Sequence, residues 1–107
     1  MDFPFDHERF DVYRVAMEVA RWVATAPFPA GNADLRDQAL RASRSVVLNI
    51  AEGVGRGHGA ASRHHLRLAL GSAAEASAAL DLMSVAGSAD QQHKLRRVGA
   101  MLRRMGA

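Results

Sequence analysis

Apolar and polar positions recur along the chain with the spacing of amphipathic helices. In the central part, small and apolar side chains repeat every three or four residues, which places them on one face of a helix. These residues are Ala39, Ala42, Ser43, Val46, Ile50 and Val54. The same spacing returns in three other stretches, so the sequence predicts an all-α fold built as a bundle of helices.

Helix-breaking residues separate the four stretches. Pro27 and Pro29 end the first one, because proline lacks an amide donor and clashes inside a helix. Glycines alternate through the second break, and Gly87 marks the third. We therefore expect one domain over residues 1–107, with an N-terminal arm at 1–8 and helices at about 9–26, 34–54, 60–86 and 90–105.

Two of the predicted helices carry a second apolar stripe beyond the one that a bundle core needs. The second helix has Val47, Leu48 and Ala51 on its other side. The third helix has a corresponding stripe, made of Leu68, Ala79, Leu82 and Ala86. A surface helix of a small monomer usually shows one stripe, so the second favours a partner subunit over leucines that are simply exposed.

Trp22 lies on a flank of the first helix, where it either covers a neighbouring subunit or caps the edge of the core. Few aromatic residues and many alanines also predict a thin core, and thin cores often gain stability by oligomerisation. The side chains that we expect at an oligomer interface are Trp22, Val47, Leu48, Leu68 and Leu82.

Asn49 and Glu52 are the polar residues of the central stretch that most need an explanation. A polar group at the edge of a core must find a hydrogen bond or cost about 1–3 kcal/mol. We interpret both as structural, with Glu52 paired to Arg56 at i,i+4. No second acid or nucleophile stands near them in the sequence, so neither is expected to be catalytic.

Charge is unevenly distributed along the chain. Residues 1–40 carry seven acids and four arginines, whereas residues 41–107 carry ten basic residues and four acids. Lys94 is the single lysine, and arginine suits bidentate contacts with phosphate. We expect nucleic-acid contacts from Arg41, Arg44, Arg56, Arg63, Arg67, Arg96, Arg97, Arg103 and Arg104. Alternatively, the basic residues only confer solubility.

Several other classes of protein are not favoured. The sequence has no cysteine, and it has no apolar run of the roughly 20 residues that a membrane span requires. The acidic N-terminus lacks a signal-peptide pattern, so we expect a cytoplasmic protein. His64 and His65 are adjacent and point apart on a helix, while His58 precedes it, so no metal or other cofactor is predicted.

The predicted second helix ends in a motif formed by Asn49, Ile50, Ala51, Glu52, Gly53, Gly55 and Arg56. This motif is the most specific match to a known family that the chain resembles, the 23S ribosomal RNA intervening-sequence proteins. Further matching positions are Phe10, Val12, Tyr13, Phe28, Pro29, Leu35, Gln38, Arg41, Ala42, Ser43, Ser45, Val46, Leu66, Ala69, Gly71, Ser72 and Glu75. The chain departs from the family at Ala73 and Ala76, where leucines are usual.

This resemblance implies an up-down-up-down four-helix bundle that assembles as a homopentamer. It implies a basic surface or central channel that binds RNA or DNA, and no established enzymatic activity. The chain also looks like the accessory proteins of diversity-generating retroelements, which would make a reverse transcriptase a partner. Our hypothesis is a non-enzymatic oligomer that binds nucleic acid, and the alternative is a protein-interaction scaffold that does not.

Overall fold

The computed structural model describes residues 5–107, and Phe3 and Pro4 of the predicted arm lie outside this range. Within the arm, Asp6–Arg9 form a short 3-10 helix, η1. Four α-helices follow: α1 (Asp11–Thr25), α2 (Ala33–Gly55), α3 (Ala60–Met83) and α4 (Ser88–Arg104). The predicted all-α fold is confirmed.

The helix ends differ from the predicted ones by no more than three residues, and the largest difference is at the end of α3. The sequence predicts this helix to Ala86, but it ends at Met83 because Ser84 adopts a left-handed backbone, with a φ of 52°. Gly87 is also left-handed, with a φ of 83°, and α4 begins directly after it. The turn between α3 and α4 therefore spans residues 84–87 and begins earlier than the periodicity suggests.

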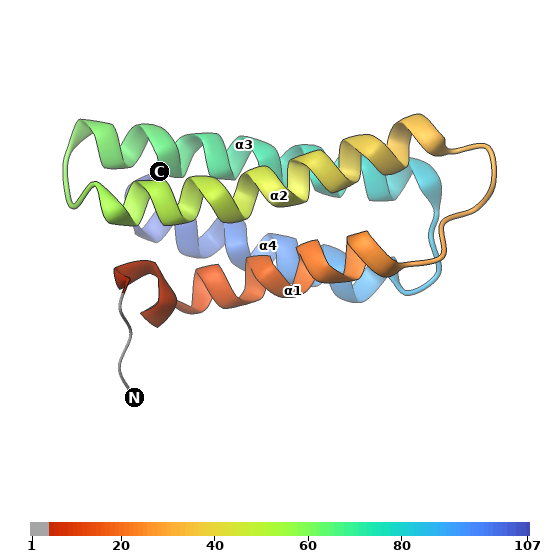
Figure 1. The fold of residues 1–107 in the computed structure, drawn as a ribbon, viewed down its shortest axis with the longest axis horizontal. Coiled ribbons are helices and arrows are strands. Elements are labelled where there is room, and N and C mark those ends of the chain that lie inside the picture. Colours follow the sequence, from red (N-terminus) through yellow and green to blue (C-terminus); the bar gives the residue numbers. More distant parts are fainter. Residues whose placement is uncertain (1–4) are drawn as a thin grey trace.

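The helices run up, down, up and down in a bundle of 42 × 30 × 19 Å (Figure 1). Each helix packs against its two neighbours in the order α1, α2, α3, α4, and α4 packs back on α1. The α2–α3 turn, η1 and the C-terminus lie at one end of the bundle (Figure 1). The bundle thus has four grooves, one between each pair of neighbouring helices.

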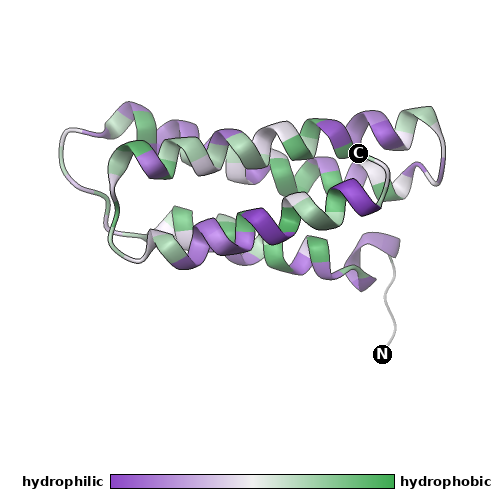
Figure 2. Cartoon of the chain, turned by 180° about the vertical axis from the view of Figure 1, so that it is seen from behind, coloured by the Kyte–Doolittle hydropathy of each residue, from purple (hydrophilic) through white to green (hydrophobic). Residues whose placement is uncertain are grey.

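The core is made largely of small and β-branched side chains. Figure 2 shows hydrophobic and hydrophilic segments alternating along the helices, as amphipathic helices require. Ile50, Leu80 and Leu102 are the largest side chains that are almost completely buried. The contribution of α3 is mostly alanine, from Ala69, Ala73, Ala76 and Ala79.

Burial corrects two of the faces assigned from the sequence. Val47 was placed on the second stripe of α2, but it is only 9% exposed and belongs to the core. Ala79 was placed on the second stripe of α3, and it is also buried in the core. The core stripe of each helix is wider than the strict three-four spacing indicates.

Candidate nucleic-acid interface

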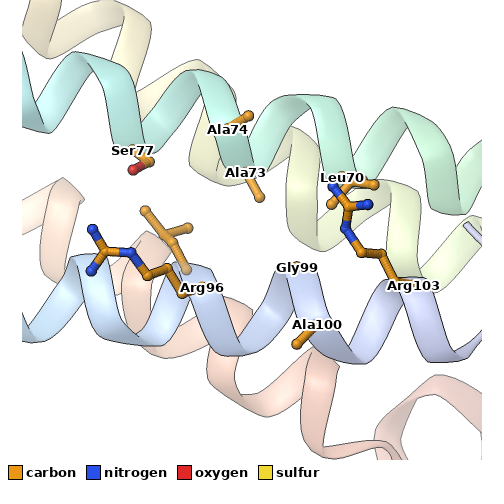
Figure 3. A pocket seen from close by; sticks show the side chains of 9 residues that line it. Leu70, Ala73, Ala74, Ser77, Arg96, Gly99, Ala100 and Arg103 are labelled. Atoms are coloured by element: carbon orange, nitrogen blue, oxygen red, sulfur yellow. The ribbon is translucent and has the colours of Figure 1, made fainter.

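The arginine side chains are all exposed on the surface of the bundle, but the helices divide them among different grooves. The groove between α3 and α4 has a volume of about 400 Å³, and Arg96 and Arg103 extend from α4 into the space between the two helices (Figure 3). The rest of its lining is small or apolar, and consists of Leu70, Ala73, Ala74, Ser77, Leu95, Gly99 and Ala100. No acidic side chain lines this groove among the described residues.

The small residues of this groove let the two helices approach closely. A Cβ atom added to Gly99 of α4 would lie 3.6 Å from Leu70 Cδ1 of α3. Farther along, Gln92 bridges the helices by accepting a hydrogen bond from Ser77 and donating one to the Ser77 carbonyl at 2.7 Å. Gln92 Nε2 also donates to Asp81 Oδ1 at 3.0 Å, so the acid at this end of α3 is already bonded.

Two further arginines continue the same side of α3 toward its N-terminus. Arg63 lies against Gly106, just beyond the end of α4. A Cβ atom added to Gly106 would be 3.7 Å from both Cγ and Cδ of Arg63. Arg67 follows one helical turn later. Arg97 and Arg104 are exposed on α4 beside Arg96 and Arg103. We call the six arginines at positions 63, 67, 96, 97, 103 and 104 the α3–α4 basic face.

The α3–α4 basic face carries positive charge that no neighbouring carboxylate neutralises. Within residues 5–107, none of its six arginines takes part in an ion pair. Exposed guanidinium groups without an internal partner can make charge-assisted, bidentate hydrogen bonds to phosphate. The structure thus places six of the nine arginines predicted to contact nucleic acid on two adjacent helices, with Arg96 and Arg103 in the groove between them.

The other three predicted arginines lie elsewhere. Arg56 donates two hydrogen bonds to Glu52, from Nη2 at 2.8 Å and from Nε at 3.2 Å, so the predicted i,i+4 pair is confirmed. The hydrogen bond and charge of Arg56 lower the pKa of Glu52 from its ordinary value of 4.5. Arg44 lines the α1–α2 groove, and Arg41 lines the α2–α3 groove.

A polar network joins α2 to α3 around Asn49. Its Nδ2 donates to the carbonyl and hydroxyl oxygens of Ser45, both at 3.0 Å, and its Oδ1 lies 3.1 Å from His65 Nδ1. Ser45 in turn shares a 2.8 Å hydrogen bond with Ser72. Asn49 thus has the hydrogen bonds that a structural role requires, but the sequence did not show that His65 is its partner on α3, or that Ser72 is the partner of Ser45.

The glycines of the motif shape the end of α2. A Cβ atom on Gly53 would lie 2.9 Å from Leu66 Cδ2, so the absence of a side chain lets α2 pack tightly on α3. A Cβ atom added to Gly55 would have no other atom within 4 Å. Gly57 and Gly59 have φ angles of 78° and 122°, which favour glycine. The geometry therefore explains glycine at positions 53, 57 and 59, whereas nothing in the described structure explains it at position 55.

Three of the predicted interface side chains are exposed leucines. Leu48 is 68% exposed, Leu68 is 44% exposed and Leu82 is 71% exposed. Trp22 instead is half-buried against the core, and its ring makes an edge contact with Phe28 at a centroid distance of 6.1 Å. Of the two interpretations of Trp22, its packing within the subunit fits a side chain that caps the core edge.

The part of the chain that the structure describes holds no group of three or more side chains that could bind a metal ion. His64 and His65 lie edge to face, at a centroid distance of 5.3 Å. No helix among the described residues is long and apolar enough to pass through a membrane.

The fold defines the chain as an all-α, four-helix-bundle protein. A family model described as "23S rRNA-intervening sequence protein" matches residues 8–105, which is nearly the whole chain. The chain belongs to this family. Neither a curated protein sequence nor a solved structure matches it.

Proposed function

We propose that this protein is a non-enzymatic homo-oligomer, a homopentamer, that binds RNA through the α3–α4 basic face. The observation that carries the proposal is the position of Arg63, Arg67, Arg96, Arg97, Arg103 and Arg104 along two adjacent helices. The chain belongs to a family whose description refers to an intervening sequence of 23S rRNA, and this supports RNA as the ligand.

The geometry of the groove suits a sugar–phosphate backbone. Arg96 and Arg103 are seven residues apart on α4, which corresponds to about 10.5 Å along the helix. This spacing lets them contact different phosphates of one strand. The floor between them is small and apolar, so a strand can approach closely. Among the residues that the structure describes, no aromatic or amide side chain lines the groove to read individual bases. Binding should consequently tolerate many sequences.

The proposal is tested by fluorescence anisotropy with a labelled single-stranded RNA at several salt concentrations. Wild-type affinity should fall steeply with salt, because each neutralised phosphate releases counterions. The double variant Arg96→Gln/Arg103→Gln should bind about tenfold or more weakly, with a shallower dependence on salt.

The matched control is Arg9→Gln/Arg14→Gln, which removes the same charge from arginines that are paired with Asp6 and Asp11. This control should retain most of the wild-type affinity. Absence of RNA binding even at low salt would reject the proposal and leave the protein-interaction scaffold. Equal losses in the two variants would show that net charge matters and the groove does not.

A further inference from the structure

An apolar groove between α1 and α2 is open on the subunit surface. Its apolar lining comes from both helices and consists of Met17, Ala20, Ala24, Val47 and Leu48. Arg21 and Arg44 complete the lining, one from each helix. No acidic side chain contributes to the groove among the described residues. The groove therefore offers apolar area together with positive charge.

The exposed side of α3 next to α2 has the complementary features. Leu68 is 44% exposed, and Glu75 is exposed and forms no ion pair with the residues that the structure describes. Between them, a Cβ on Gly71 would meet no atom within 4 Å. Glycine within a helix costs about 1 kcal/mol relative to alanine, and no contact among residues 5–107 requires it here. We call Leu68, Gly71 and Glu75 the α3 ridge.

We infer that the α3 ridge of one copy binds in the α1–α2 groove of the next copy. In this head-to-tail contact Leu68 covers Met17 and Leu48 of its neighbour, and Gly71 lets the helix backbones approach. Glu75 then faces Arg21 and Arg44, so that an unpaired carboxylate meets two arginines. The inference rests on the proposed oligomer and specifies its interface.

The two surfaces lie at the same height along the bundle. Ser45 and Asn49 of α2 hydrogen-bond to Ser72 and His65 of α3, which sets the register of the two helices. Leu48 lies between Ser45 and Asn49 in the sequence of α2, and Leu68 lies between His65 and Ser72 in the sequence of α3. Both leucines are therefore at the same level along the bundle. A ring whose axis is parallel to the bundle requires this, because rotation about the axis preserves height.

The angle between the two surfaces also fits a small closed ring. The α1–α2 groove and the α3 ridge lie on either side of α2, on adjacent sides of a four-cornered bundle. A pentamer needs an angle of about 108° between the two contact directions of each subunit, which is little more than a right angle. The helix α2 then faces the ring axis, and α4, at the opposite corner, faces outward with its arginines.

The first test is the mass in solution, measured by light scattering after gel filtration at micromolar concentration. Leu68→Glu disables the ridge and Arg44→Glu disables the groove, so each should reduce the wild-type assembly to the 11.5 kDa subunit. Ala74→Glu is the control, since Ala74 is exposed on the α4 side of the same helix. Circular dichroism should show unchanged helix content in all three.

The second test uses pairs of variants. A mixture of Leu68→Glu and Arg44→Glu should form a one-to-one dimer of about twice the subunit mass, because one chain keeps the groove and the other keeps the ridge. In a single chain, Glu75→Arg combined with Arg44→Glu should recover assembly that either change alone abolishes. An interface formed by the same patch on both copies would instead close the wild type at a dimer, with no larger assembly.

The outcomes separate the interface from the proposed function. A wild-type protein that is monomeric would overturn both this interface and the oligomer. A wild-type oligomer that persists in Leu68→Glu and Arg44→Glu would overturn the interface alone. Single variants that dissociate but do not combine in the mixture would overturn the head-to-tail pairing.

Discussion

Gly53 shows at the scale of one residue why glycine occupies the end of α2. A Cβ at this position would lie 3.1 Å from Leu66 Cγ and 3.2 Å from the carbonyl oxygen of Ser62. Leu66 is buried in the core and the Ser62 oxygen is backbone, so neither has room to move. In Gly53→Ala, overpacking should lower the free energy of unfolding by about 1–3 kcal/mol. The higher helix propensity of alanine should offset up to about 1 kcal/mol of this loss.

The neighbouring glycine provides the comparison for this measurement. Gly55 also lies in the last turn of α2, but a Cβ there meets no atom within 4 Å. Gly55→Ala should leave the midpoint of urea unfolding unchanged or raise it slightly. A Gly53→Ala midpoint at or above that of the wild type would show that α2 and α3 adjust without cost, contrary to the tight packing described above.

At the scale of elements, the pairing of α2 with α3 depends on a polar network as well as on apolar packing. Asn49 is bonded both to Ser45 within its own helix and to His65 on α3. Removing one partner leaves a part-buried polar group with an unmade hydrogen bond, at a cost of about 1–3 kcal/mol. Asn49→Ala and His65→Ala should each destabilise the protein by an amount in this range.

A double-mutant cycle on Asn49 and His65 measures the network directly. The combined variant should be less destabilised than the sum of the single variants, by about 0.5–3 kcal/mol, because the two side chains share one hydrogen bond. Asn49→Ala with Arg104→Ala serves as the control pair, since Arg104 is exposed on α4. Additive effects in the Asn49–His65 cycle would mean that this bond adds no stability in solution.

At the scale of the whole molecule, RNA binding should depend on assembly. One subunit offers a few phosphate contacts, and a ring repeats them around its outer side, so linked sites raise the effective affinity. Leu68→Glu leaves every arginine of the α3–α4 basic face in place. It should nevertheless bind a long RNA at least tenfold more weakly than the wild type, with a smaller slope against salt.

A short RNA gives the internal control for this prediction. An RNA that spans a single subunit should bind the wild type and Leu68→Glu with similar affinity, because it cannot bridge two copies. Equal affinity of the two proteins for the long RNA would show that each subunit binds independently.

Much of the fold followed from local patterns in the sequence. The four helices and their breaks depend on the spacing of side chains within one helix and on residues such as Pro27 and Gly87, so a single sequence reveals them. The Glu52–Arg56 pair was predictable for the same reason, because residues four apart on a helix are neighbours. The exposed leucines at positions 48, 68 and 82 also stood out by their spacing.

The tertiary structure decided what depends on how the helices face one another. Spacing alone could not show that Val47 and Ala79 are buried, because that is set by how widely the neighbouring helices cover each face. Nor could it pair Asn49 with His65, which is sixteen residues away. The sequence listed nine candidate arginines, but only the packing of α4 on α3 showed that two of them, Arg96 and Arg103, line one groove. Such groupings arise from contacts between distant parts of the chain, which helical periodicity does not encode.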